Sequence, residues 1–311
     1  MKPLIAVIGA NPAWQKTLFF KELTPGKVNR AFREENYPSG KGVNFCRALR
    51  CSGLGESIIF QFAGGVNGEL HCQALEQSNY SHRTIRTEGA TRNCITCLDE
   101  CGNMTELIAP SQKITAEEAE KFLAELAKEL PRTDLLAIAG SLPDKSDPEL
   151  YCQAAALAAE NGIPLLADTL AGLDGILSVK ATAILKVNKE EFFKITGEDE
   201  IFSAHRCAQK RYPGKVFAIT DGADKATLSA GNKCWSYTLP EIQVVNPLGA
   251  GDTASAVMSA LIAAKVPFHE AFLQALAAAS ANCMTANAGD FNVETSRELA
   301  EKITVESINL W

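Results

Sequence analysis

The sequence lacks any block of lysine and arginine, and its overall charge is acidic. Its 30 basic and 37 acidic residues give a net charge of −7 and an isoelectric point near 5.3. Proteins that bind nucleic acid or an anionic membrane without specificity need a concentrated positive surface. The composition therefore argues against both classes, and an anionic substrate would have to be held by basic residues gathered locally.

Long apolar runs are also absent. No stretch approaches the length of a membrane-spanning helix. The N-terminal "MKPLIAVIGANPAW" has one basic residue and a short apolar run that ends at a polar turn, which is typical of a first buried strand rather than of a signal peptide. We expect a cytoplasmic protein that binds neither a membrane nor nucleic acid.

The cysteines give little sign of a disulfide framework or a metal site. Most of the ten fall within apolar helix and strand patterns, where cysteine behaves as a small hydrophobic residue. The closest group, Cys94, Cys97 and Cys101, has no fourth ligand nearby at a suitable spacing. We interpret these residues as core or hairpin cysteines in a reducing environment.

No linker, low-complexity segment or internal repeat divides the 311 residues, so we predict a single domain over residues 1–311. Past the middle, apolar strand-like stretches alternate with helical patterns. This alternation predicts an α/β fold with a mostly parallel central sheet and helices on both faces. The strand-like stretches are 135–141, 163–169, 183–188 and 215–222.

Two segments, at about 11–38 and 88–110, lack helical periodicity. The second resembles two strands joined by a Gly-Asn turn, so we predict a small antiparallel β-flap that forms a lid beside the main sheet. Beyond it, Thr115 and Glu118 have the spacing of a capping box and predict a helix start. A further helix is predicted from Pro148 to Asn161.

The sequence Gly-Ala-Gly-Asp at 249–252 is the first candidate site. The β-prone residues at 242–245 predict a strand before it, and apolar residues at helical spacing follow it. Free backbone N–H groups and the dipole at a helix start attract anions, and glycines keep no side chain in the way. The pattern predicts an anion pocket, in which Asp252 is either a functional carboxylate or a helix cap.

The second glycine cluster is Gly40, Lys41 and Gly42, placed before another helical pattern. It is not a P-loop, because the spacing and the Ser/Thr after lysine are missing. By itself this cluster is also compatible with a turn and a solvated lysine. Two glycine-lined helix starts, one with a lysine and one with an aspartate, favour a site that joins two anionic or polar reactants.

These two loops resemble those of the PfkB/ribokinase family of small-molecule kinases, and the resemblance covers nearly the whole chain. Further matching motifs follow in the family's order: "AGSLP" (139–143), "ADT" (167–169), "KVNKEE" (186–191) and "TDGADKA" (220–226). "NPAW", "GKVNR" and "TRN" resemble the hexose-phosphate branch, which contains 1-phosphofructokinase and tagatose-6-phosphate kinase. The resemblance implies a ribokinase-like fold and, in some members, a homodimer through the flap.

The implied reaction is ATP-dependent transfer of a phosphoryl group to a hydroxymethyl of a phosphorylated ketohexose, most like 1-phosphofructokinase, with Mg²⁺. Asp252 would accept the hydroxyl proton, for which a carboxylate of ordinary basicity suffices. The N–H groups of Gly249, Ala250 and Gly251 would hold the charge on the transferring group.

The substrate would be held by both glycine-rich and flap segments. We expect Lys41 and Arg92 at its phosphate, with Arg30 a weaker third. Gly40, Asn44, Ser141 and Gln15 complete the predicted substrate site. Gln15 stands where the branch has an acidic residue, and the Asp144-Lys145 pair replaces small residues, so both changes leave the identity of the sugar open.

The nucleotide side is predicted from the later motifs. Asn188 and Glu191 resemble the family's Asn-x-x-Glu motif, with Glu191 on the Mg²⁺, although a plain helix-start acid explains Glu191 equally simply. Thr220, Gly222 and Asn282 are expected beside the nucleotide. The alternatives are a kinase of an unphosphorylated sugar or nucleoside, which Lys41 and Arg92 disfavour, and an inactive sugar-phosphate sensor, which Asp252 disfavours.

Overall fold

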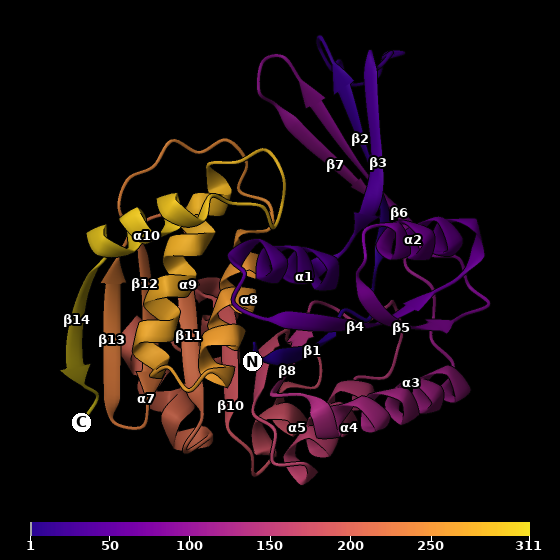
Figure 1. The fold of residues 1–311 in the computed structure, drawn as a ribbon. Coiled ribbons are helices and arrows are strands. Elements are labelled where there is room, and N and C mark those ends of the chain that lie inside the picture. Colours follow the sequence, from indigo (N-terminus) through magenta and orange to yellow (C-terminus); the bar gives the residue numbers. More distant parts are fainter. Residues whose placement is uncertain (1) are drawn as a thin grey trace.

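The computed structural model describes residues 2–311 and is built around one large sheet (Figure 1). Its strands are β1 (Leu4–Ile8), β4 (Glu56–Ala63), β5 (Ser81–Arg86), β8 (Leu135–Ala139), β9 (Leu165–Asp168), β10 (Ala183–Asn188), β11 (Val216–Asp221), β12 (Lys225–Ala230), β13 (Lys233–Thr238) and β14 (Thr304–Asn309). Their spatial order is β14-β13-β12-β11-β10-β9-β8-β1-β4-β5. The pairs from β5 to β11 are parallel, and those from β11 to β14 are antiparallel. The predicted mostly parallel sheet is confirmed.

Helices cover both faces of this sheet because its parallel strands are apolar on both sides. In β1, Ile5 and Val7 join one core cluster, whereas Ala6 and Ile8 join the other. The first cluster lies under α1 (Lys41–Ser52), α8 (Ala250–Ala263), α9 (Phe268–Cys283) and α10 (Val293–Lys302). The second lies under α3 (Ala116–Glu129), α4 (Glu149–Glu160), α5 (Leu173–Ser178), α6 (Lys189–Thr196) and α7 (Ile201–Arg211). The remaining helices are α2 (Gly65–Gln77) and a 3₁₀ turn at Leu130–Arg132.

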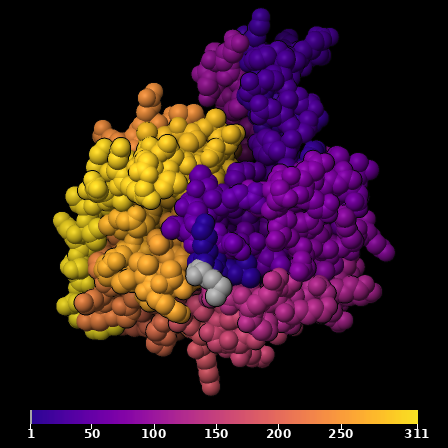
Figure 2. Space-filling view, in the orientation of Figure 1, coloured from indigo at the N-terminus to yellow at the C-terminus, as the bar shows by residue number. Residues whose placement is uncertain are grey.

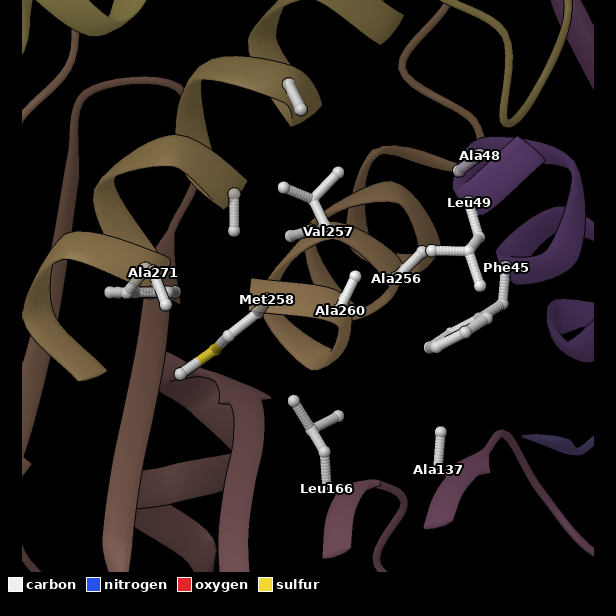
Figure 3. Close-up of a cluster of buried hydrophobic side chains, with 14 of the residues drawn as sticks. Phe45, Ala48, Leu49, Ala137, Leu166, Ala256, Val257, Met258, Ala260 and Ala271 are labelled. Carbon is white, nitrogen blue, oxygen red and sulfur yellow. The ribbon is translucent and has the colours of Figure 1, made fainter. Parts of the chain in front are cut away.

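Helix α8 is buried along most of its length (Figure 3). Its residues from Asp252 to Ala260 are all buried, because small and apolar side chains occur on every face of the helix. Phe45, Ala48 and Leu49 of α1 lie on one side of it, and Ala137 and Leu166 of the sheet lie on another. The packing fixes the start of α8, where Gly-Ala-Gly-Asp is found, against α1 and the sheet.

A second, smaller sheet rises from the body of the molecule (Figure 2). It consists of β2 (Ala13–Phe20), β3 (Arg33–Ser39), β6 (Arg92–Asp99) and β7 (Met104–Ile108), in the order β3-β2-β6-β7. These strands and the loops joining them are called the flap below. The outer pairs are antiparallel as expected, but β2 and β6 are parallel, because both of these inner strands run away from the body.

Several local predictions can be compared with the structure. The capping box of Thr115 and Glu118 begins α3, and α4 lies between Pro148 and Asn161, as predicted. The strand predicted at 242–245 is wrong, since this segment is an irregular loop. The N–H groups of Val245 and Asn246 both donate to the carbonyl of Cys283, so the end of α9 holds the segment instead of a neighbouring strand.

Within residues 2–311, no helix is both long enough and apolar enough to cross a membrane.

Candidate active site

The start of α8 has the geometry of an anion pocket. Gly249 caps the helix with φ of 80°, and a Cβ there would lie 2.7 Å from Ala288 Cβ, so glycine is required. At Gly251, an added Cβ would meet only Lys186 Nζ, at 3.3 Å. The first turn of α8 therefore offers its backbone N–H groups beside an ammonium group, which suits a negatively charged ligand.

Asp252 lies in this first turn, and its side chain is buried. Its Oδ2 accepts a hydrogen bond of 2.9 Å from Asn44 Nδ2 on α1. Burial, reinforced by the negative charge of Asp168, raises the pKa of Asp252 to about 6. The carboxylate is therefore more basic than the sequence suggested, and a proton acceptor near neutral pH benefits from such a shift.

Asp168, at the end of β9, is buried and is the centre of a network of charges that reaches the surface at the half-exposed side chain of Lys41. Its Oδ2 accepts hydrogen bonds from Lys186 Nζ at 2.7 Å and Ser255 Oγ at 2.9 Å, and its Oδ1 accepts one from Lys41 Nζ at 3.0 Å. Burial would raise the pKa of Asp168, but Lys186 and Lys41 outweigh it and hold the pKa at about 2. Asp168 therefore stays ionised and fixes two lysines beside Asp252.

Lys41 is the first residue of α1, and Gly40 is the N-cap, so the helix begins within the Gly-Lys-Gly sequence rather than after it. Burial works to lower the pKa of Lys41, but the charges of Asp168 and Asp252 outweigh it and raise the pKa. A smaller contribution from Glu191 acts in the same direction. This ammonium group thus lies among the carboxylates of the site, close to the start of α8.

Arg92 and Gln15 lie where the flap joins the body. Arg92 begins β6, and its Nη2 donates to the carbonyl of Asn11 at 3.4 Å. Its Nε is buried and has no hydrogen-bond partner among residues 2–311. Gln15 on β2 is buried, and its Nε2 donates to Thr96 Oγ1 at 2.8 Å. An arginine with a free buried N–H suits an anionic group of a ligand.

The remaining substrate-side predictions divide into two outcomes. Ser141 follows β8 and is exposed, with Asn11 Nδ2 3.4 Å from its Oγ. Arg30 is exposed in the loop at the far end of the flap, beyond the eight residues of β2. Such a strand is roughly 25 Å long, so within this chain Arg30 does not join Lys41 and Arg92, and its predicted grouping with them is wrong.

On the predicted nucleotide side, Asn188 and Glu191 form a capping box at the start of α6. Asn188 Oδ1 accepts from the N–H of Glu191 at 2.8 Å, and Glu191 Oε2 accepts from the N–H of Asn188 at 3.0 Å. Thr220 lies near the end of the adjacent β11, and Gly222 follows in a turn with φ of 64°. These residues share the carboxyl edge of the sheet, where α/β proteins bind ligands.

The position of Asn282, on α9, does not fit the predicted contact with a nucleotide. Its side chain is fully buried and donates to the carbonyl of Leu248 at 2.9 Å. Its Oδ1 accepts from Thr253 Oγ1 at 3.1 Å and from the N–H of Gly289 at 2.7 Å. Asn282 therefore positions the segments around the start of α8, because its side chain is fully buried and both of its polar atoms are bonded within the protein.

The sequence model of the pfkB family of carbohydrate kinases matches residues 2–295. The chain belongs to this family. A tagatose-6-phosphate kinase of Staphylococcus epidermidis is 28% identical over 312 aligned residues, which cover 97% of this chain and 99% of that relative. Phosphofructokinase-2 of Escherichia coli, solved in complex with potassium, superposes with a TM-score of 0.87 at 19% identity, covering 96% of this chain and 99% of the other. Its complex with fructose 6-phosphate gives 0.84 at 19% identity over the same shares.

Membership in the pfkB family makes the chain a carbohydrate phosphotransferase, and the predicted ribokinase-like fold is confirmed. Sequence reasoning did not select Asp168 and Lys186 as site residues, although both lie in motifs that match this family. A signal was present in "AILKVN", where Lys186 interrupts a buried apolar strand. A lysine at such a position needs a buried acidic partner, and Asp168 at the end of the adjacent β9 supplies it.

Proposed function

We propose that this pfkB-family enzyme transfers the γ-phosphoryl group of ATP to a hydroxymethyl group of a phosphorylated ketohexose. The observation that carries the proposal is the buried Asp252 at the glycine-lined start of α8, with Lys41 held close by through Asp168. The S. epidermidis relative is named a tagatose-6-phosphate kinase, which supports a ketohexose phosphate as the acceptor. The proposal treats the 311 residues as one kinase domain with the flap as its lid.

In the proposed reaction, Asp252 accepts the proton of the attacking hydroxyl. The raised pKa of Asp252, about 6, leaves most of it ionised at neutral pH and makes it a better proton acceptor than an ordinary aspartate. Asn44 donates to one oxygen of Asp252 and so orients the other toward the substrate. Phosphoryl transfer needs mainly positioning and charge stabilisation, so this carboxylate and its neighbours are sufficient.

The transferring phosphoryl group would lie against the N–H groups of Gly249, Ala250 and Gly251. Lys186 is next to this turn, and Lys41 is held near it by Asp168, so two ammonium groups offset the negative charge that develops there. This gives Lys41 a place at the reacting centre rather than at the phosphate already on the sugar. Arg92, with its buried free Nε, is assigned to that second phosphate.

Mg²⁺ fits the proposed nucleotide site through Glu191. No group of three or more histidine, cysteine, aspartate or glutamate side chains able to hold a metal occurs among residues 2–311. One carboxylate is compatible with Mg²⁺, which keeps several waters and is held mostly by the phosphates of a nucleotide. When bound, the ion would neutralise phosphate charge. Asn188 shapes the position of Glu191 through the capping box, and Thr220 and Gly222 remain the proposed contacts of the nucleotide.

A homodimer through the flap is part of the proposal. On the outer strand β7, Leu107 and Ile108 are 55% and 61% exposed, which suits burial against a second copy. Arg30, remote from the site of its own chain, also lies on the flap. Sedimentation velocity would detect the dimer.

The function is tested by measuring ADP release over fructose 1-phosphate, fructose 6-phosphate, tagatose 6-phosphate, ribose and nucleosides. We expect a phosphorylated ketohexose to be preferred. Asp252→Asn should lower kcat by a factor on the order of 10² or more, while the affinity for the substrate stays within a few-fold of wild type. A preference for ribose or a nucleoside would show that the proposed substrate class is wrong. Sugar phosphate binding without any ADP release would instead indicate a sensor.

A further inference from the structure

The loop between β8 and α4, residues 140–148, contacts two of the segments that connect the flap to the body. The first segment runs from β1 to β2, where Asn11 Nδ2 donates to the carbonyl of Leu142 at 3.3 Å. The second runs from β7 to α3 and contains Ser111, whose contacts are with Asp144. A single loop of the body therefore touches both the first entry of the chain into the flap and its last exit from the flap, which is called the exit below.

The contact at the exit is reciprocal. The N–H of Ser111 donates to Asp144 Oδ2 at 3.0 Å, and the N–H of Asp144 donates to Ser111 Oγ at 2.7 Å. The N–H of Ile114 adds a third contact, to Ser146 Oγ at 3.4 Å. Two residues that each use a side chain to satisfy the other's backbone fix the distance and the orientation of the two segments.

The same loop begins at the catalytic centre. The N–H of Gly140 donates to the carbonyl of Asp168 at 3.0 Å, and a Cβ added at Gly140 would lie 3.2 Å from the side chain of Lys41. Ser141 follows at the predicted substrate edge. Asp144, at the exit of the flap, is thus only four positions after Gly140, which contacts Asp168.

The loop keeps a conformation that its sequence does not favour. Lys145 has φ of 58°, the left-handed region that lysine rarely adopts, and such a conformation persists where surrounding contacts fix it. In this chain the carboxylate of Asp144 is directed to the flap connection, not to Asp252 or the other residues of the site.

We propose that Asp144 is a positioning residue, which ties the exit of the flap to the loop that carries Ser141 and so fixes the flap over the sugar. The proposal rests on the proposed function for its second part, the covering of the sugar. It accounts for the acidic residue at this position without assigning it to sugar recognition. Asp144 acts through the backbone of Ser111 and takes no part in the chemistry.

The test compares Asp144→Ala with Asp144→Asn, whose amide oxygen still accepts from the N–H of Ser111. For Asp144→Ala we expect the KM for the sugar to rise about 5- to 10-fold, the scale of one lost hydrogen bond at an exposed site, with the KM for ATP unchanged. Hydrolysis of ATP without sugar phosphorylation should increase, because the flap excludes water less well. Asp144→Asn should return both values to within about two-fold of wild type.

Asp147→Ala is the matched control. Asp147 lies in the same loop and also accepts from a backbone N–H, that of Glu149, but within residues 2–311 it forms no hydrogen bond with the flap or with the segments that connect it to the body. An equal rise of the sugar KM in Asp147→Ala, or equal rises of the sugar and ATP KM values in Asp144→Ala, would overturn the proposal.

A readout without activity separates this proposal from the proposed function. Hydrogen exchange of the backbone amides at 104–111 should become faster in Asp144→Ala and not in Asp144→Asn or Asp147→Ala. Unchanged exchange in all three variants overturns the tie, whatever substrate is found. Faster exchange in a protein that phosphorylates none of the sugars would support the tie and refute only the proposed function.

Discussion

At the scale of single residues, two aspartates about one site have opposite titration behaviour. Asp168 holds both lysines, so its pKa is about 2, whereas Asp252 has one amide donor and a pKa of about 6. Burial acts on both carboxyls in the same direction. The difference comes from where Lys41 and Lys186 lie, and environments that separate two pKa values in this way are typical of catalytic sites.

A pH profile of kcat/KM should show this difference. Because Asp252 must be ionised to accept a proton, kcat/KM should fall about tenfold per pH unit on the acidic side of the profile. The midpoint of this acidic limb should lie near pH 6. In Asp168→Asn a negative charge that raises the pKa of Asp252 is removed and two lysines are left unneutralised, so the limb should move to lower pH. Glu117→Gln, at an exposed ion pair with Lys121, serves as the control and should leave the limb in place. An unmoved limb in Asp168→Asn would show that another group controls the profile.

At the scale of helices and strands, the predictions from sequence were most accurate for elements that a local pattern of residues is sufficient to define. The capping box of α3 and the apolar strands β8 to β11 depend on neighbours in sequence, and both were predicted. The false strand at 242–245 had β-prone residues but no partner strand, and Val245 is 61% exposed. The parallel pairing of β2 and β6 could not be predicted either, because it depends on how two distant hairpins leave the body.

The site shows the same division. Residues in glycine-rich motifs were selected because the helix starts at Gly40 and Gly249 can be found locally. The bond from Asn44 to Asp252 and that from Lys41 to Asp168 join residues more than one hundred positions apart, so no spacing in the sequence indicates them. Asn282 was assigned to the nucleotide for a related reason, since its burial arises from three segments that meet only in the fold.

The start of α8 permits a prediction with two glycines as each other's control. Gly249→Ala should lower the free energy of unfolding by about 2 kcal/mol or more, because φ is positive there and the new Cβ meets Ala288 and Gly289. Gly251→Ala meets only Lys186 Nζ, at 3.3 Å, which needs to shift by a few tenths of an ångström, and alanine is the better helix former, so any loss of stability should be much smaller than in Gly249→Ala.

For activity we expect the opposite order, in which the more stable variant, Gly251→Ala, loses more. The methyl group of Gly251→Ala stands in the anion pocket, so kcat/KM should fall by on the order of 10² in a fully folded protein. Urea denaturation and steady-state kinetics on both variants check this pair of outcomes. Wild-type activity in Gly251→Ala would show that the first turn of α8 is not part of the phosphoryl site.

At the scale of the whole molecule, two buried histidines link stability to pH although neither takes part in the proposed reaction. His71 on α2 lies between Gln61 and the carbonyl of Ala13, at the base of the flap. His205 on α7 lies between hydroxyl groups of Thr227 and Ser229. Burial lowers the pKa of His71 to about 4 and that of His205 to about 3, so both are neutral in the folded protein at neutral pH.

These shifts predict a loss of stability in mild acid. Above pH 6.5 the histidines are neutral in both states, whereas below it the unfolded chain takes up protons that the folded protein does not. The free energy of unfolding should therefore fall by up to about 1.4 kcal/mol per pH unit for each histidine, levelling off below the folded pKa values. Asp252 opposes this between its pKa of about 6 and its ordinary 3.8, because there the folded protein binds the extra proton. Because two histidines lower the free energy of unfolding in acid and only one carboxyl raises it, the net effect is a loss of stability.

Urea denaturation from about pH 7 to pH 5 measures this slope, and His205→Gln isolates one contribution. The glutamine amide retains a donor and an acceptor for Thr227 and Ser229 but cannot take up a proton in this range. The variant can be less stable at every pH, since its packing against Phe192 changes. Its slope should nevertheless be smaller than that of the wild type by up to about 1.4 kcal/mol per pH unit. Equal slopes would mean that His205 is protonated within the fold, and the hydroxyls of Thr227 and Ser229 would then be accepting both of its N–H groups.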